Sequence, residues 1–453
     1  MSSQYSIVDD GVQASTANAE HLSHALTAFV RPLLSKLTLT LDVRLVQTFV
    51  ATLHVLLQFR HRNNGLLLSE LGGYLATPDH APAGTKRLSN LLRSPKWSSQ
   101  QIEQELWLQA DDRLTELEQA QEPALLMWDE SVIEKPESIQ LEGLCAVRSS
   151  KARRLKRIKP GYYNPPGGPP ICVPGMHWLT LLLLGTSGRP TLAAMKWWTT
   201  RGAFATSGRQ TEVDLLDACQ QQWGRRVISV FDQGFAGSPW LGLCLQRQLR
   251  FIVRWHKGYH LRDEQGRKRA PGRISGPKRS WGERRVWDAR RRQWFQGGVV
   301  AIAVTHPDYE ESLWLVVSRP GKGRPPWYVL TNEPVTCEED AWKIVFAYAR
   351  RWQIEREFRY NKSELAMESP RVWQWETRLR LLSMVSLVYA FLLTLLDAAA
   401  EKLKLWLLRF WCHRTGKRCR QAETPLYRLR WAVSRLWTTH PPALLPSPLL
   451  NSG

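Results

Sequence analysis

Three acidic residues occur at positions where they could share a metal ion. Asp129 follows the apolar run ALLMW and Asp232 follows the apolar run VISVF, and each run is typical of a buried strand. Glu355 lies in a segment with helical spacing. Residues at the carboxyl ends of strands line the ligand crevice of an α/β fold, and carboxylate oxygens suit hard divalent cations. Together the three acids indicate metal-dependent chemistry, whereas either aspartate taken alone is explained more simply as the cap of a turn.

Four residues around Glu355 share one face of a helix, if a single helix runs through all of them. They are spaced by three, four and seven residues and fall within roughly a 60° arc: Tyr348, Arg351, Glu355 and Lys362. Glu355 could complete a metal site, while Arg351 could bind one phosphate with its forked guanidinium and Lys362 could neutralise another. The alternative is a surface helix with an ordinary ion pair between Arg351 and Glu355.

The charge of the chain indicates a polyanionic partner. The chain has 62 Lys and Arg residues against 41 Asp and Glu residues, a net charge of +21 and a pI near 10.0. A charge of this size favours nucleic acid by attraction and by the release of counterions. We therefore expect binding to double-stranded DNA, the alternative being a basic protein that adheres to acidic surfaces in general.

Two basic segments are candidates for contact with the DNA backbone. The first is a short helix and turn that contains Lys86 and Arg87. The second is a basic, Pro- and Gly-rich loop soon after Asp129, whose candidate contacts are Lys151, Arg153, Arg154, Lys156 and Arg157. Phosphate contacts of this kind would position DNA without reading its sequence. A solvated basic surface is the alternative for both segments, and a disordered linker is a further alternative for the loop.

Cysteine usage and hydropathy argue against several other classes of protein. The seven cysteines are scattered without a CxxC pair, which disfavours a disulfide framework or a zinc ribbon. The N-terminus lacks the basic start and apolar core of a secretory signal. The apolar run at 381–396 is short for a bilayer span, so we predict a buried core helix there and no membrane partner. The expected location is the cytoplasm, with access to the nucleoid.

The elements that position the candidate acids follow an α/β order. From residue 124 to 255 the patterns predict strand, strand, strand, helix, strand, helix and strand, the order expected of an RNase H-like sheet. We predict an α/β fold class, with an RNase H-like catalytic core that a β-rich insertion interrupts and with helical N-terminal and C-terminal regions.

The predicted division of the chain has five parts. They are a helical DNA-binding domain at 1–115, the first part of the core at 120–258, the insertion at 259–335, the second part of the core with the Glu355 helix at 336–396, and a helical region at 397–453. The last region could supply a dimer surface through Trp406, Leu407, Leu408, Phe410 and Trp411, or these side chains could simply pack in the core.

The spacing Tyr-x2-Arg-x3-Glu-x6-Lys resembles the YREK signature of one large group of insertion-sequence DDE transposases. The surrounding segment RRWQIEREFRYNKSELAMES is similar to that group as well. Asp129 in LLMWDES and Asp232 in VISVFDQGF lie at the places of its two aspartates. The long gap from Asp232 to Glu355 resembles members with a β-strand insertion before the catalytic Glu. The resemblance covers about residues 120 to 395.

This resemblance implies a cut-and-paste reaction on DNA. Asp129, Asp232 and Glu355 would be catalytic and would hold two Mg²⁺ ions, which Mn²⁺ could replace. The ions would activate a water, nick double-stranded DNA at terminal inverted repeats and let the freed 3′-hydroxyl attack target DNA. Tyr348, Arg351 and Lys362 would contact the DNA. A homodimer that bridges two DNA ends is implied as well.

The same resemblance points to one further residue, and two other functions remain as alternatives. Trp327, in PPWYVLTNEPV, resembles a Trp of hairpin-forming members that stacks on a base flipped from the duplex, the alternative being a core Trp in a strand. A nuclease that cuts without joining is the first other function. A domesticated DNA-binding protein without catalysis is the second, and the complete acidic triad argues against it.

Overall fold

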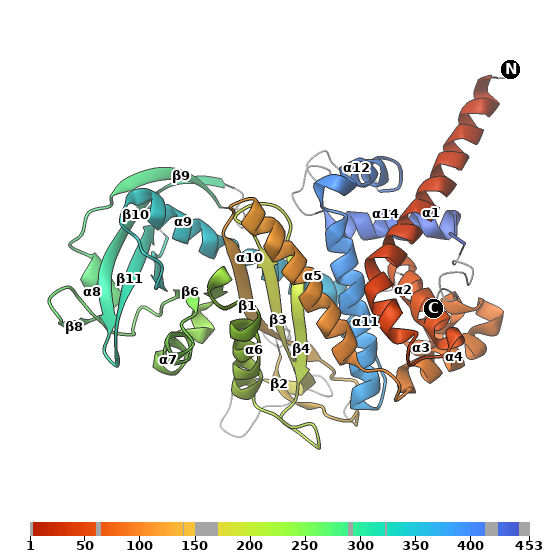
Figure 1. The fold of residues 1–453 in the computed structure, drawn as a ribbon, viewed down its shortest axis with the longest axis horizontal. Coiled ribbons are helices and arrows are strands. Elements are labelled where there is room, and N and C mark those ends of the chain that lie inside the picture. The colour runs from red at the N-terminus through yellow and green to blue at the C-terminus, as the bar shows by residue number, and fades with distance from the viewer. Residues whose placement is uncertain are drawn as a thin grey trace.

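The computed structural model describes residues 3–59, 65–138, 140–149, 171–288, 293–321, 324–412 and 425–443. Within these ranges one sheet of 12 strands runs through the molecule, and helices cover it. The β-rich insertion lies at one end of the sheet and the N-terminal helices lie beyond the other end (Figure 1). The five basic residues predicted in the loop lie outside the described residues: Lys151, Arg153, Arg154, Lys156 and Arg157.

The RNase H-like core is built from five strands. β4 (Thr191–Trp198), β3 (Cys172–Leu184), β1 (Ala124–Glu134), β5 (Val227–Phe231) and β6 (Arg250–Arg254) lie side by side in this order. The pairs β4–β3 and β3–β1 are antiparallel, and the pairs β1–β5 and β5–β6 are parallel. Helices α6 (Gly208–Gln222) and α7 (Ser238–Gln246) make the two parallel crossovers. The predicted element order and fold class are confirmed. A short strand that was not predicted, β2 (Cys145–Arg148), pairs with β3.

The insertion extends the core sheet. It contains β7 (Leu261–Arg262), β8 (Lys268–Arg269), α8 (Pro271–Ser275), β9 (Gly282–Asp288), β10 (Gln293–His306), β11 (Tyr309–Arg319) and β12 (Trp327–Thr331). β12 pairs with β6 in antiparallel fashion, so the insertion continues the hydrogen-bonded ladder of the core. The apolar runs that predict strands in this region, 299–304, 313–317 and 327–330, lie within β10, β11 and β12.

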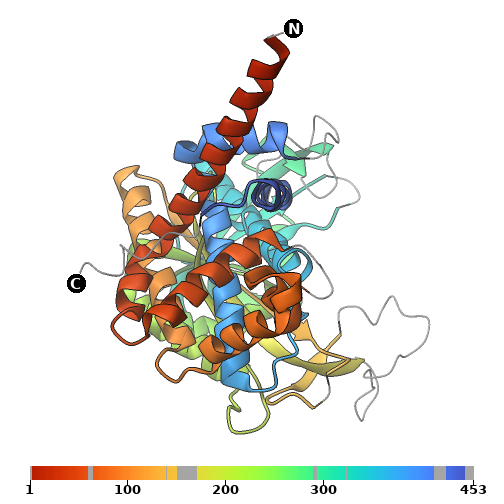
Figure 2. The same ribbon diagram turned by 90° about the vertical axis from the view of Figure 1, so that its right-hand side faces the viewer.

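Helices at both ends of the chain share one hydrophobic core. The first group is α1 (Ser3–Leu37), α2 (Val43–Gln58), α3 (Leu68–Leu75), α4 (Ala81–Arg93) and α5 (Ser99–Gln119). The second group is α9 (Glu338–Ala349), α10 (Trp352–Ser363), α11 (Trp375–Thr394), α12 (Glu401–Phe410) and α14 (Leu426–Thr439). Apolar side chains of both groups join those of one sheet face in a single cluster, whereas α6, α7 and the C-terminal half of α5 pack on the other face. Figures 1 and 2 show the N-terminal end of α1 extending beyond this body.

Helix α11 contains the apolar run that could be mistaken for a membrane span. It is long and apolar enough to cross a bilayer by length and composition, but 83% of its most apolar window is buried inside the protein. It lies between the sheet and the N-terminal helices (Figure 1). The predicted buried core helix is confirmed.

Candidate active site

Asp129 and Asp232 lie next to each other at one edge of the parallel strands. Trp128 pairs with Phe231 in the β1–β5 ladder, and each aspartate is the next residue along its own strand direction. Asp232 directly follows β5, and its Oδ1 accepts a hydrogen bond of 2.5 Å from the backbone N–H of Gly234. Asp232 is therefore a turn cap as well as a candidate ligand, because the two roles use the same position.

The expectation that a strand ends at Asp129 was wrong. β1 continues to Glu134, and residues 130–134 pair with residues 175–179 of β3. The apolar run stops at Asp129 because residues 129–132 are not fully buried, although the strand pairing continues through them and Ile133 is buried again. Loss of hydrophobicity therefore marks a partly exposed stretch within β1, and the strand ends farther along the chain.

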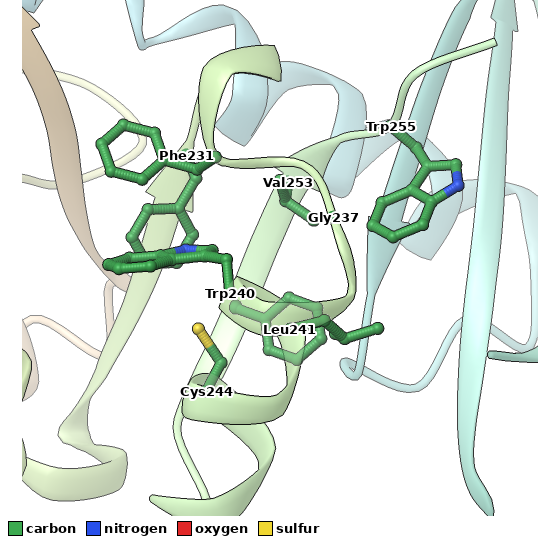
Figure 3. Close-up of a pocket in the computed structure, with 9 residues that line it drawn as sticks. Phe231, Gly237, Trp240, Leu241, Cys244, Val253 and Trp255 are labelled. Carbon is green, nitrogen blue, oxygen red and sulfur yellow. The ribbon is translucent and has the colours of Figure 1, made fainter. Parts of the chain in front are cut away.

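Apolar side chains pack between the sheet and α7 next to Asp232. Phe231, Trp240 and Trp255 line a small cavity between β5, β6 and α7 (Figure 3). Its volume is about 10 Å³, room for at most one water molecule. This cavity belongs to the packed core that holds the end of β5 and is too small to be a substrate site.

Arg351 connects two of the three candidate acids. Its Nη1 donates to Oδ2 of Asp129 at 2.8 Å, and its Nη2 donates to Oε1 of Glu355 on α10. The side chain of Arg351 is only 11% exposed, against 35% for Glu355. The i,i+4 ion pair that the sequence allowed as an alternative is therefore present, but it is part of a buried cluster with Asp129 and is no ordinary surface pair.

The prediction of one continuous helix through Tyr348 and Lys362 was wrong. α9 ends at Ala349 and α10 begins at Trp352. In the turn between them, the N–H of Arg351 donates to the carbonyl of Tyr348 at 3.0 Å, a tighter i,i+3 bond. Arg350 uses its guanidinium to bind the carbonyl of Gly188 at 2.7 Å. The backbone of Arg351 keeps helical angles (φ −53°, ψ −27°), so the functional side chains still converge.

Tyr348, Trp327 and Arg254 form the wall of the site next to Arg351. The ring of Tyr348 meets the ring of Trp327 edge to face, with centroids 5.4 Å apart. The guanidinium carbon of Arg254 lies 5.4 Å from the centre of the Trp327 ring. Burial raises the pKa of Tyr348, and the nearby Arg351 and Arg254 partly oppose this. Sequence reasoning missed Arg254, whose only signal is its place at the end of the strand after Asp232.

Lys362 completes the set from the other end of α10. Its Nζ donates to the hydroxyl of Ser131 at 2.7 Å. Ser131 is two residues beyond Asp129 on β1, so both side chains lie on the same face of the strand. The ammonium group is therefore held on the same sheet face as the acids.

The electrostatics of the site centre on Asp129. Burial raises its pKa to about 7, which Arg351 partly opposes and the neighbouring charge of Asp232 reinforces. The pKa of Arg351 is also raised: its burial is outweighed by Tyr348, Asp129 and Glu355 around it. A buried carboxyl whose charged form is disfavoured in this way gains most from a cation beside it.

The carboxylates of Asp129, Asp232 and Glu355 lie close enough to influence one another electrostatically. Their oxygen atoms are the ligands that hard divalent cations prefer. Among the described residues, however, no group of three or more His, Cys, Asp or Glu side chains is already gathered around one metal position. The guanidinium of Arg351 contacts two of the three carboxylates instead. Asp129, Asp232 and Glu355 are thus the residues that would hold cations, and Arg351 is the positive group now beside two of them.

The predicted DNA contacts of the N-terminal region lie elsewhere. Lys86 and Arg87 are exposed on α4. This helix packs on α2, α3 and α11. The structure therefore brings Tyr348, Arg351, Lys362 and Trp327 together around the acids, and it leaves Lys86 and Arg87 on a separate surface.

These features define an α/β protein with an RNase H-like core and an acidic site at the edge of its parallel strands. Residues 206–391 match the family model described as Transposase DDE domain. This span includes Asp232 and Glu355, while Asp129 precedes it. No curated protein matches the sequence. The chain is similar in structure to a piggyBac transposase in a synaptic complex with hairpin DNA, at 13% identity and a TM-score of 0.40, over 96% of this chain and 83% of that one.

Proposed function

We propose that the chain is a DNA transposase that cleaves double-stranded DNA at the ends of a transposable element and joins the freed ends to target DNA. The observation that carries the proposal is the meeting of Asp129 on β1, Asp232 after β5 and Glu355 on α10, with the guanidinium of Arg351 bound to Asp129 and Glu355. The match of residues 206–391 to a transposase DDE domain supports the same class of reaction.

Asp129, Asp232 and Glu355 would hold two Mg²⁺ ions, and Mn²⁺ would be able to replace them. Bound there, the cations would supply an activated water and stabilise the leaving 3′ oxygen. Asp129 must lose its proton to act as a ligand, and its raised pKa links this step to pH. Arg351 must release at least one carboxylate, and its freed N–H groups then suit a DNA phosphate.

The remaining side chains of the site would hold the DNA strand. Lys362 is fixed by Ser131 and presents a positive charge on the sheet face of Asp129. Arg254 and Tyr348 flank Trp327, so a base that leaves the duplex would meet an aromatic ring next to two phosphate-binding groups. The protein would act in the cytoplasm at the nucleoid.

A homodimer is part of this proposal, since cutting two ends of one element requires both ends to be held together. Helix α12 offers a limited surface for it. Leu407 and Leu408 are buried in the core, so the core alternative holds for these two residues. Leu405 and Phe410 remain 53% and 59% exposed and are the candidates for a subunit contact.

The test of the proposed function is cleavage of an end-labelled duplex taken from the DNA on either side of the coding sequence. We expect a nick at one phosphodiester with Mg²⁺ and none with EDTA, followed by transfer of the cut end to an added plasmid. Cutting without transfer would favour the nuclease. Binding of the duplex without a cut would favour the non-catalytic DNA-binding protein.

Replacing Trp327 by alanine is expected to leave the first nick intact and to reduce hairpin formation about tenfold, since stacking of one base is worth roughly 1–3 kcal/mol and 1.4 kcal/mol is a factor of ten. Denaturing gels that separate nicked from hairpin product provide the measurement. The exposed Trp373, replaced in the same way, is the matched control. An unchanged hairpin yield in Trp327→Ala would show that Trp327 has only a packing role.

The double variant Lys86→Ala/Arg87→Ala is expected to bind duplex DNA with a weaker dependence on salt. The slope of log affinity against log salt should fall by about 0.9 for each phosphate that the variant no longer neutralises, for any DNA sequence. The control variant Lys402→Ala/Arg409→Ala removes the same charge from α12. Equal slopes for wild type and Lys86→Ala/Arg87→Ala would place the DNA away from α4.

A further inference from the structure

Two arginines on opposite faces of α11 bind different parts of the protein. Arg378 and Arg380 are two residues apart, which places their side chains roughly 200° apart around the helix. Both donate hydrogen bonds to backbone carbonyls of other segments. The helix that carries them lies between the catalytic sheet and the N-terminal helices (Figure 1).

Arg378 binds the catalytic side. Its Nη2 donates to the carbonyl of Glu142 at 2.5 Å, and its Nη1 donates to the carbonyl of Val372 at 3.1 Å. Glu142 lies in the connection between β1 and β2, and its carboxylate accepts the N–H of Trp375 at 2.6 Å. The side chain of Arg378 is fully buried, so this end of α11 is fixed to the continuation of the strand that carries Asp129.

A second interaction fixes the same end. The ammonium of Lys135, directly after β1, donates to the carbonyl of Glu368 in the segment between α10 and α11. Lys135 is 1% exposed. The segment that follows β1, the segment that follows the helix of Glu355 and the start of α11 are therefore held together by buried charged hydrogen bonds. Such bonds are about twice as strong as neutral ones.

Arg380 binds the N-terminal side. Its Nη1 donates to the carbonyl of Leu92 at 2.9 Å, and its Nε donates to the carbonyl of Trp97 at 3.0 Å. Leu92 is in the last turn of α4, where carbonyls lack partners within the helix and the helix dipole attracts a positive charge. The indole N–H of Trp97 donates to the carbonyl of Leu91 at 2.8 Å, which closes the same helix end.

The other side of α4 is exposed. Leu88, Leu91 and Leu92 are buried, and four polar residues are exposed or half-exposed along the outer side: Lys86, Arg87, Asn90 and Arg93. A Cβ on Gly84 would lie 2.0 Å from the carbonyl oxygen of Gly72, so α3 and α4 can cross this closely only with glycine there. A helix with cations and an amide on its outer face suits the major groove, where Asn and Arg can pair with base edges.

We infer that α11 is a rigid connection that fixes α4, as the DNA-reading helix, at a set distance from the catalytic acids, with Arg380 as the positioning residue. This inference rests on the proposed function. It follows that the bond to be cut is chosen by the geometry of the protein: DNA bound on α4 reaches the acids in one register only.

The variant Arg380→Ala tests this inference. DNA affinity should stay near that of wild type, because Arg380 binds the inner side of α4, away from the DNA. The rate at the wild-type bond should fall about 10²-fold and cuts should spread to neighbouring bonds, because a misplacement on the order of 1 Å costs that much. Arg380→Lys, which keeps the charge without the fork, should restore part of the precision. The end-labelled duplex of the function test, mapped at single-nucleotide resolution, gives the readout.

Arg319→Ala is the matched control. Arg319 also donates to two backbone carbonyls beside a helix end, at Ser275 (2.6 Å) and Lys278 (2.9 Å), but it lies in the insertion. Its cut position should match that of wild type. If Arg380→Ala cuts the wild-type bond at the wild-type rate, the inference is wrong, and the interaction of Arg380 with α4 is structural only.

If the wild type does not cut DNA, the proposed function is rejected, but the inference about α11 is not. Amide hydrogen exchange then tests that inference. Binding of the same duplex without metal should slow exchange in α4 and also at 364–374 in the wild type. Arg380→Ala should retain the first effect and lose the second. Protection that never reaches 364–374 in the wild type, or reaches it equally in Arg380→Ala, would overturn the rigid connection.

Discussion

Replacing Asp129, Asp232 or Glu355 by alanine is expected to lower the rate of DNA nicking by about 10³-fold or more. The estimate follows because metal ions stabilise the transition state by several kcal/mol, and each 1.36 kcal/mol is tenfold in rate. Each of the three side chains comes from a different element, so none can take over the role of another. Single-turnover cutting of the labelled duplex with Mg²⁺ measures the rate.

The matched control for these variants is Glu130→Gln. Glu130 is the next residue of β1, and its side chain lies on the opposite face of the strand from Asp129. Burial raises its pKa, which His177 and Arg209 oppose and the charge of Asp232 reinforces, so Glu130 shares the electrostatic character of the acids without an ion pair to Arg351. We expect nearly normal cutting in Glu130→Gln. A triad variant that cuts as well as Glu130→Gln would remove that acid from the catalytic set.

The core of the fold could be predicted because its signals are local. A buried strand such as Val227–Phe231 appears in the sequence as a continuous apolar run, and an amphipathic helix such as Gly208–Gln222 appears as apolar residues at helical spacing. The continuation of β1 to Glu134 could not be predicted in this way. Its hydrogen bonds are made with a distant strand, and hydrophobicity reports burial and not backbone pairing.

The candidate site was predictable in its members and less so in its arrangement. Spacing brought Tyr348 and Arg351 to one face, and the i,i+3 turn between α9 and α10 preserves that proximity without a continuous helix. Arg254 could not be found by spacing, because it reaches Trp327 only through the pairing of β6 with β12. Arg351 contacts both Asp129 and Glu355 because β1 and α10 pack together, and residue spacing does not report that packing.

Arg351 makes both of the contacts that matter to the two interpretations of its sequence pattern. Its i,i+4 pair with Glu355 is the contact that the spacing predicts, and its second ion pair, with Asp129, makes the same side chain part of the acidic cluster. A positive group in this place lowers the repulsion between carboxylates that would otherwise face each other. The three carboxylates can therefore lie close together without a metal ion, and a divalent cation can still replace Arg351 beside them.

The pKa of Asp129 makes the stability of the metal-free protein depend on pH in a defined direction. Burial, opposed by Arg351, raises this pKa from 3.8 to about 7, so between these values the folded chain binds more protons than the unfolded chain. The free energy of unfolding therefore falls as pH rises from about 4 to about 7. At 1.36 kcal/mol per pKa unit, the full shift corresponds to at most about 4 kcal/mol at pH 8.

The variant Asp129→Asn is therefore expected to be more stable than the wild type at pH 8 in EDTA, by up to about 4 kcal/mol, although it should not cut DNA. The amide keeps the size of the side chain and removes the buried charge. The difference should vanish near pH 4, where Asp129 is protonated in the folded protein. Urea unfolding of both chains at the two pH values measures this difference. Groups such as Glu212, whose pKa burial also raises, contribute equally to both chains and cancel in the comparison.

Added Mg²⁺ should stabilise the wild type at pH 8 and not the variant, because only the wild type retains all three ligands. A variant less stable than the wild type at pH 8 would mean that the interaction with Arg351 outweighs the burial of the charge.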